Sequence, residues 1–197
     1  AIAALKFYYK KVLNRTFQVE RLRTQKKLFP VLSIGEVERL FDSAKNEKHM
    51  MLLKFLYYTG ARLSEVINLK CSDIDFERNQ IHIKSGKGRK DRFITINPEY
   101  EAELKKYVST YEQESYVFST LKGKYSKRSV QKICSTYAKK AEISKNITPH
   151  TLRRTFATHL IEKNIHIYKI SKLMGHASTN TTEGYISYAK IPLTASL

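Results

Sequence analysis

The segment H-T-L-R-R-T-F-A-T-H at residues 150–159, followed by L-M-G-H-A-S-T-N-T-T-E-G-Y at residues 173–185, is the stretch around which the rest of the chain can be ordered. It places His150 and Arg153 three residues apart. Positions i and i+3 share one face of a helix, so an imidazole and a guanidinium with this spacing can bind one small anion together. A phosphate group fits such a pair.

The same stretch ends in a second histidine and a tyrosine. His176 follows a glycine, and Tyr185 comes nine residues later. Glu162 is the only acidic residue between His150 and Glu183. The stretch therefore lacks the clustered carboxylates that bind Mg²⁺ or Mn²⁺ in metal-assisted phosphoryl transfer. Any phosphate chemistry here is expected to proceed without a metal.

The composition indicates a basic globular domain. Of the 197 residues, 42% are hydrophobic, which is enough to bury a sizeable core in one domain. Lys and Arg number 36 against 18 Asp and Glu, a formal net charge of +18. Such an excess favours a polyanion, because each phosphate neutralised by Lys or Arg releases counterions. Nucleic acid is the expected partner. A membrane is not, because no apolar run approaches the roughly 18 residues of a spanning helix.

The cysteines and the phosphate-binding motifs give further limits. Cys71 and Cys134 are far apart and lack C-x-x-C spacing, so neither a zinc site nor a disulfide framework is predicted. A reducing cytoplasm fits this pattern. The chain has no G-x-x-x-x-G-K-[ST] phosphate loop. We therefore expect no metal, nucleotide or other cofactor.

Two upstream motifs complete the pattern: T-G-A-R-L-S-E at residues 59–65 and S-G-K-G-R-K-D-R at residues 85–92. A lone His-x-x-Arg is a weak signal, and a single tyrosine is more often a packing residue than a nucleophile. The order and spacing of all these motifs together are specific. From residue 33 to residue 188 the chain resembles the tyrosine recombinases, which include the phage integrases and the Xer proteins. The positions that match the active site of this family are Arg62, Lys87, His150, Arg153, His176 and Tyr185.

The resemblance implies an α+β fold that is mainly α-helical, with a small antiparallel β-sheet carrying the lysine hairpin. It also implies a division of the chain. Residues 1–20 would be the last helix of a truncated core-binding domain, although an ordinary first helix is the alternative. Residues 21–32 would be a basic linker, residues 33–188 the catalytic domain and residues 189–197 a C-terminal tail.

Periodicity and capping signals predict the individual elements. Ser33 and Glu36 form a capping box that starts a helix. Strand-like alternation in residues 80–85 and 92–96 predicts a hairpin whose tip contains Lys87. A short strand is expected at residues 116–119. The expected helices span residues 1–15, 33–45, 48–58, 63–69, 98–112, 127–141, 150–163, 167–174 and 180–188.

Basic side chains outside the six matched positions are candidates for DNA contacts, although a solvated basic surface is the alternative for each. The helix that starts near residue 127 is expected to enter the major groove, as the matching segment does in the family. The candidates are Lys26, Lys27, Lys90, Arg92, Lys124, Lys127 and Arg128.

A phenol is a weak nucleophile at neutral pH, so Tyr185 needs an activated phosphorus and a place for its proton. Arg62 and Arg153 can bind the nonbridging oxygens of a phosphodiester, and His176 would add a hydrogen bond. His150 is suited to accept the tyrosine proton. The resemblance implies that Lys87 protonates the leaving 5′ oxygen, and that the product is a 3′-phosphotyrosyl link.

Two neighbours compete for these roles. Tyr188 is a rival nucleophile, but Tyr185 has the family's distance from His176. Arg154 is a rival to Arg153, but it stands at i+4 from His150, where the pattern requires i+3.

The sequence therefore predicts a site-specific DNA recombinase or integrase that acts on double-stranded DNA. In the family, C-terminal segments dock on neighbouring protomers, so a tetramer on DNA is expected through the tail. A type IB topoisomerase would share the chemistry. A DNA-binding module without catalysis and a metal-dependent nuclease are the alternatives from other classes.

Overall fold

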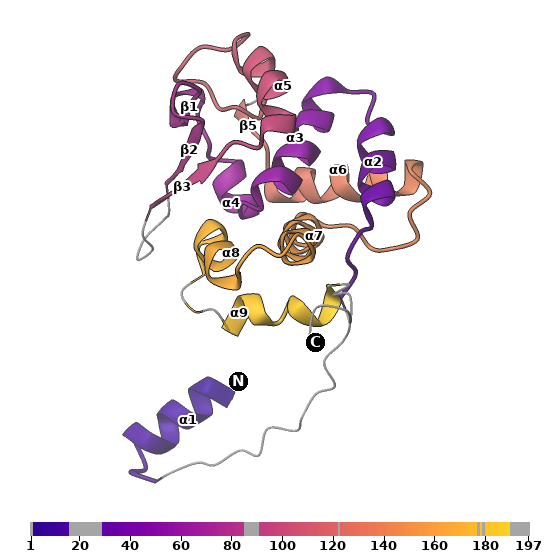
Figure 1. The fold of residues 1–197 in the computed structure, drawn as a ribbon. Coiled ribbons are helices and arrows are strands. Elements are labelled where there is room, and N and C mark those ends of the chain that lie inside the picture. Colours follow the sequence, from indigo (N-terminus) through magenta and orange to yellow (C-terminus); the bar gives the residue numbers. More distant parts are fainter. Residues whose placement is uncertain are drawn as a thin grey trace.

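The computed structural model describes residues 2–15, 29–84, 91–121, 123–176, 178 and 180–189. Figure 1 shows the helices and strands with their labels. They are α1 (Ile2–Lys11), α2 (Ile34–Asp42), α3 (Glu47–Thr59), α4 (Leu63–Val66), η1 (Cys71–Asp73), β1 (Ile74–Asp75), β2 (Gln80–Ile83), β3 (Arg92–Thr95), α5 (Pro98–Val108), β4 (Ser119–Thr120), β5 (Gly123–Lys124), α6 (Lys127–Lys140), α7 (Pro149–Glu162), α8 (Ile167–Met174), α9 (Asn180–Glu183) and η2 (Ile186–Tyr188).

Side chains that cap the helices fix where they begin. Ser33 accepts a hydrogen bond from the backbone N–H of Glu36, and the Glu36 carboxylate accepts one from the N–H of Ser33. This confirms the capping box predicted at the start of α2. Asn97 and Thr148 cap α5 and α7 by accepting the N–H groups of Glu99 and Thr151, and a proline follows each of them in the first turn.

The main sheet is antiparallel, in the order β1-β2-β3. Ile81 pairs with Ile94 across β2 and β3, and both are fully buried. The predicted hairpin is confirmed, although its tip at residues 85–90 lies outside the described residues. β1 is too short to show alternation and was not predicted. The strand expected at residues 116–119 is displaced: β4 begins at Ser119 and pairs with β5.

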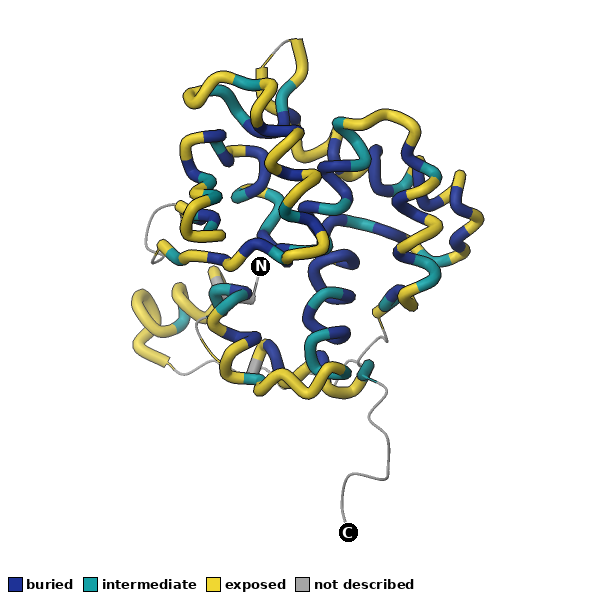
Figure 2. The backbone as a smooth tube through the Cα atoms, turned by 45° about the horizontal axis from the view of Figure 1, so that its top comes forward, coloured by how far each residue is buried: buried dark blue, intermediate teal, exposed yellow. Residues whose placement is uncertain are grey.

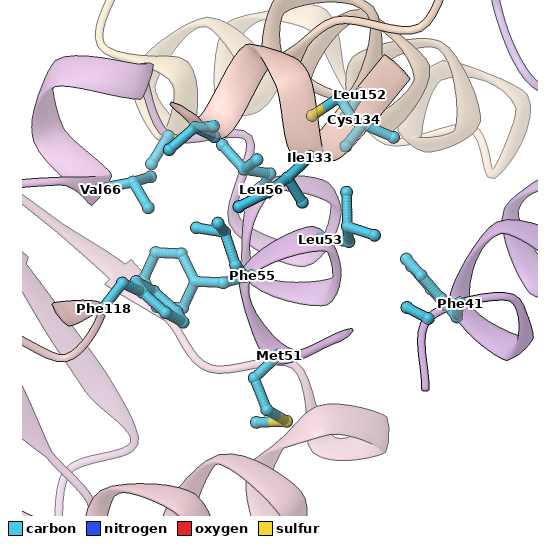
Figure 3. Packing of buried hydrophobic residues seen from close by; sticks show 14 of the residues in the cluster. Phe41, Met51, Leu53, Phe55, Leu56, Val66, Phe118, Ile133, Cys134 and Leu152 are labelled. Carbon is cyan, nitrogen blue, oxygen red and sulfur yellow. The ribbon is translucent and has the colours of Figure 1, made fainter. Parts of the chain in front are cut away.

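The hydrophobic core is built around α3. Met51, Leu52, Phe55 and Leu56 on this helix are all at most 2% exposed. Phe55 packs edge-on against Phe118, with 5.3 Å between the ring centroids, and Figure 3 shows the two side chains together. α3 also packs on α7; α8 lies beside α7, and α9 lies on the side of α7 that faces away from α3 (Figure 1). α7 is therefore an internal helix, and segments on both sides of it can meet at its side chains.

The segment that leads into α2 belongs to this core. Leu32, at the end of the predicted linker, is 1% exposed. Its N–H donates to Thr155 on α7, and its carbonyl accepts from His159. Figure 2 shows the buried stretches in the middle of the molecule and the exposed ones at its outer turns. Lys26 and Lys27 lie outside the described residues.

The predicted first helix is confirmed as α1. Several of its large apolar side chains face solvent, among them Leu5, Phe7 and Tyr8. Its assignment to a core-binding domain remains a prediction. None of the helices in the described part of the chain has the length and apolar character needed to cross a bilayer.

Candidate active site

Arg62 is positioned by the turn that ends α3. Gly60 has φ +56° and ψ +21°, the left-handed conformation that reverses the chain after the helix. Arg62 then forms the N-cap of α4, and its Nη1 donates to Oε1 of Glu65 at 2.9 Å. Its Nη2 donates to the carbonyl of Gly175. The guanidinium is thus fixed between α4 and the end of α8.

Glu65 also binds a second arginine. Arg92 Nη1 and Nη2 donate to its two carboxylate oxygens at 2.9 and 2.8 Å, and Arg92 Nε donates to the carbonyl of Leu173 at 2.9 Å. The Arg92 side chain is only 10% exposed. Its contact with DNA backbone phosphates stays a prediction; in this structure all three of its guanidinium nitrogens are engaged within the protein.

The charge on Glu65 is held by these arginines. Burial alone opposes ionisation of the carboxyl group, but hydrogen bonds from Arg92 and from the backbone and side chain of Arg62 outweigh it and lower the Glu65 pKa to about 2. Glu65 is therefore a carboxylate throughout the neutral range. It offsets part of the positive charge that the arginines bring to the site.

Arg153 is buried, with 4% exposure, on the inner face of α7. Its Nη1 donates to the Gly60 carbonyl, and its Nη2 donates to the Met174 carbonyl at 2.5 Å. Burial and the nearby Arg62 lower the Arg153 pKa to about 10. The guanidinium remains charged at neutral pH. The carbonyl groups at the ends of α3 and α8 therefore aim Arg153 at the same region as Arg62.

His176 follows Gly175, which ends α8 in the left-handed conformation at φ +61°. A Cβ atom on Gly175 would lie 3.0 Å from the Arg92 guanidinium carbon, and the positive φ is one that other residues rarely adopt, so both the space and the backbone favour glycine. His176 Nε2 is 3.0 Å from Arg153 Nη2, and its Nδ1 is 2.8 Å from Thr182 Oγ1. Burial and the positive charge of Arg153 lower the His176 pKa to about 4. The ring is therefore neutral at pH 7.

Tyr185 packs beside this histidine. The two ring centroids are 6.1 Å apart, and Tyr185 is 7% exposed in a small cluster with Ala157, Ile170 and Met174. The rival Tyr188 lies elsewhere, because its hydroxyl accepts a hydrogen bond from the Phe29 N–H at 3.4 Å. The geometry therefore favours Tyr185 over Tyr188 as the phenol of this site.

Arg153 and its rival Arg154 are neighbours on α7 but make different contacts. Arg154 stacks its guanidinium over the ring of Phe29, 4.1 Å from the centroid.

His150 lies at the surface in the first turn of α7, one turn before Arg153. Partial desolvation, with Arg154 and Arg153 nearby, lowers the His150 pKa and favours its neutral form. A neutral imidazole at this position can accept a proton.

The remaining predicted contacts fall into two groups. Lys87 and Lys90 lie outside the described residues. Lys127 and Arg128 are exposed in the first turn of α6, and Lys124 is exposed just before it, donating to Asn68 at 2.7 Å. Among the described residues no group of three or more His, Cys, Asp or Glu side chains is arranged to hold a metal ion.

Sequence reasoning missed Thr182 and the actual partner of Arg92. Thr182 stands in a run of threonines with no motif signal of its own, and its contact with His176 appears only in the structure. The link between Arg92 and Glu65 joins a strand to a helix, so no local spacing could show it.

Two buried or half-buried arginines, a neutral imidazole and a phenol within one small region define a site for an oxyanion, on a mainly helical fold with a small antiparallel sheet. The chain belongs to the phage integrase family, whose model matches residues 30–190. This confirms both the predicted family and the predicted fold.

Relatives and solved structures agree with this assignment. The tyrosine recombinase XerA of Pyrococcus furiosus is 40% identical over 195 residues, which cover 93% of this chain and 67% of the relative. A crystal structure of XerA recombinase has a TM-score of 0.73 at 30% identity and covers 93% of this chain and 68% of that one. A XerH site-specific recombinase in a post-cleavage complex with palindromic difH substrate has a TM-score of 0.76 at 25% identity, covering 96% and 62%. The chain spans about two thirds of the length of the proteins it matches.

Proposed function

We propose that this protein is a site-specific DNA recombinase or integrase, which cleaves and rejoins double-stranded DNA through a 3′-phosphotyrosyl link at Tyr185. The observation that carries the proposal is the meeting of Arg62, Arg153 and His176 beside Tyr185, on a fold shared with recombinases. The polarity of the link rests on the family resemblance.

The two arginines supply the electrostatic part of catalysis. Arg62 and Arg153 now donate to the carbonyl groups of Gly60, Met174 and Gly175. A nonbridging phosphate oxygen carries more negative charge than a carbonyl oxygen, so it competes well for the same N–H groups. Because the guanidiniums are already ordered, little reorganisation is needed as charge builds on the pentavalent phosphorus.

The proton transfers use the remaining groups. The Tyr185 oxygen forms a bond to phosphorus while the bond from phosphorus to the 5′ oxygen breaks. His150 accepts the phenolic proton, and Lys87 gives a proton to the leaving oxygen. The covalent link conserves the phosphodiester bond energy, so rejoining to a new strand requires no nucleotide. Neither step needs a metal ion or another cofactor.

DNA binding would use the exposed basic side chains around the site. The candidates at the described positions are Lys124, Lys127 and Arg128, and those outside them are Lys26, Lys27 and Lys90. Assembly into a tetramer on DNA, in the cytoplasm, would use the tail at residues 189–197. Deleting the chain from Ile191 onward should leave DNA binding intact and prevent the size increase of the complex on DNA.

The test of the chemistry uses a duplex with a nick close to the cleavage site. After cleavage the short fragment with the free 5′ hydroxyl dissociates, so rejoining is impossible and the covalent complex is trapped. We expect an adduct that survives denaturation, forms in EDTA, and is lost in Tyr185→Phe. Tyr188→Phe is the matched control and should still form the adduct. Cleavage that forms no adduct and is lost in EDTA would indicate a metal nuclease, and binding without cleavage would indicate a DNA-binding module. Relaxation of supercoiled DNA without a defined site would indicate the topoisomerase alternative.

A further inference from the structure

Thr182 contacts both His176 and the turn that carries Tyr185. It is completely buried in the short helix α9. Its hydroxyl oxygen lies 2.8 Å from His176 Nδ1, and its backbone carbonyl accepts a hydrogen bond from the Tyr185 N–H at 2.9 Å. One residue thus touches the imidazole with its side chain and the nucleophile's backbone with its main chain.

The present hydrogen bonds determine which ring nitrogen carries the proton. A guanidinium can only donate, so His176 Nε2 must accept from Arg153 at their 3.0 Å contact. The low His176 pKa of about 4 means that the ring is neutral and has one N–H. That N–H is therefore on Nδ1, where Thr182 Oγ1 accepts it.

A bound phosphate would require the other tautomer of His176. Phosphate oxygens accept hydrogen bonds, so Nε2 can stabilise one only when it carries the proton itself. Nδ1 must then become an acceptor, and its partner must become a donor. A hydroxyl group is able to make this change because it has one O–H and two acceptor lone pairs. A carbonyl or a carboxylate at the same position would hold the proton on Nδ1.

We propose that Thr182 is a positioning residue that allows His176 to exchange its tautomer, accepting from Nδ1–H in the empty site and donating to Nδ1 once Nε2–H binds a phosphate oxygen. The ring keeps one proton in both states, since Nδ1 releases its proton to water and Nε2 takes one up. This proposal rests on the proposed function, and it adds a role for a residue outside the six matched positions.

Thr182 also links the position of the Tyr185 backbone to the hydrogen bond that His176 makes. Because its carbonyl binds the Tyr185 N–H, any movement of α9 that brings the phenol to a phosphate carries the His176 partner with it. The hydrogen-bond donor and the nucleophile are thereby adjusted together. A side chain on a separate element would not link the two groups in this way.

The experiment compares Thr182→Val, which removes the hydroxyl at nearly equal volume, with Thr182→Ser, which keeps it. Thr181→Val is the matched control, because Thr181 is exposed and adjacent. With ¹⁵N-histidine NMR on the full chain, we expect His176 to carry its proton on Nδ1 in the free wild type, Thr182→Ser, Thr181→Val and Thr182→Val, because Arg153 donates to Nε2 in all of them. In Tyr185→Phe bound to duplex DNA, the proton should be found on Nε2, and adding Thr182→Val to this variant should leave a mixture of tautomers, because Nδ1 then has no hydroxyl donor.

Cleavage of the nicked duplex provides the second measurement. Thr182→Val should lower the rate of adduct formation about tenfold, the value of one hydrogen bond, with unchanged DNA affinity. Thr182→Ser should restore the rate. A wild-type rate in Thr182→Val, together with a full shift of the proton to Nε2 in the DNA-bound double variant with Tyr185→Phe, would overturn the inference. Failure of the wild-type chain to form any adduct would instead overturn the proposed function, and the NMR comparison of the DNA-bound variants would still decide whether Thr182 allows the tautomer to exchange.

Discussion

Arg92 holds Glu65 through two parallel hydrogen bonds of 2.9 and 2.8 Å, and both side chains are at most 10% exposed. Glu65 in turn binds Arg62, whose other nitrogen contacts the carbonyl of Gly175. Arg92, the first residue of β3 after the hairpin tip, is thereby connected to an arginine of the site. Paired guanidinium and carboxylate groups of this geometry are strong and directional. The ion pair of Arg92 and Glu65 therefore helps to fix the orientation of the Arg62 guanidinium.

Glu65→Gln tests the energetic contribution of this pair. The Glu65 pKa is lowered from 4.5 to about 2, so its charge stabilises the folded state above pH 4.5, and this stabilisation is lost as the pH falls toward 2. We expect the variant to be less stable at pH 7 by on the order of 3 kcal/mol, with the difference vanishing near pH 2. Urea unfolding between pH 7 and pH 2.5 measures this.

The control for that series is Glu114→Gln. Glu114 also forms an ion pair, with Lys70 at 2.6 Å, but its side chain is 78% exposed. Exposed pairs contribute little because water and salt screen them. Its unfolding curve should follow the wild type at every pH. Equal behaviour of the two variants would show that the contacts of Glu65 do not stabilise the fold.

Gly60→Ala tests the turn that positions both arginines. A methyl group at this position would collide with the Phe156 ring, and the left-handed φ of +56° adds backbone strain. We expect a loss of about 2–4 kcal/mol in the free energy of unfolding. Adduct formation should also decrease, because the Gly60 carbonyl binds Arg153. Thermal unfolding and the nicked-duplex assay measure the two effects.

Gly35→Ala is the opposite control. Gly35 lies in the first turn of α2, and its added methyl group would meet only Arg39 Nη1, at 3.9 Å. Alanine is the better helix former by about 1 kcal/mol. This variant should be slightly more stable than the wild type and fully active. If Gly35→Ala were also destabilised, the loss of stability in Gly60→Ala could not be assigned to the turn after α3.

The sequence was sufficient to predict features whose determinants are close together in the chain. The capping box of Ser33 and Glu36 spans one helical turn, and the i+3 spacing of His150 and Arg153 places both on one helix. Tertiary contacts were not accessible in the same way. Arg92 at the start of a strand was read as a phosphate contact, because nothing local shows that its partner is Glu65, 27 residues earlier. Leu32 was assigned to a linker for the same reason, although it is buried against α7.

Arg153→Ala and Arg154→Ala separate the two adjacent arginines of α7. Arg153 donates toward the site, whereas Arg154 stacks on Phe29. We expect Arg153→Ala to reduce the rate of adduct formation by about 10²–10³, the usual effect of removing one group that stabilises transition-state charge. Arg154→Ala should lose about 1 kcal/mol of stability and cleave at a rate close to the wild type. The reverse ranking would reassign the catalytic arginine.

His176→Gln tests the protonation state of the imidazole. The His176 pKa is lowered from 6.5 to about 4, so the unfolded chain binds a proton at a higher pH than the folded one. Stability contributed above pH 6.5 is therefore lost as the pH falls toward 4. The wild type should lose stability over this window more steeply than His176→Gln, as measured by urea unfolding. Parallel curves would mean that the folded protein protonates His176 at an ordinary pH.

Lys127→Ala with Arg128→Ala tests whether the start of α6 binds DNA. Both side chains are exposed in the first turn, where positive charge opposes the helix dipole. Removing them should raise stability by a few tenths of a kcal/mol and weaken DNA binding. If each contacts one phosphate, the slope of log K against log salt should fall by about 1.8. Titrations at several salt concentrations measure this slope.

The matched control is Lys139→Ala with Lys140→Ala, at the other end of the same helix. It removes the same two charges, so any effect of net charge on long-range attraction is equal in the two pairs. Positive charge at a helix C-terminus is favourable, so this pair should lower stability slightly. Its salt slope should stay at the wild-type value. Equal slopes for the two pairs would mean that DNA senses only the overall charge of the domain, and that the first turn of α6 makes no phosphate contact of its own.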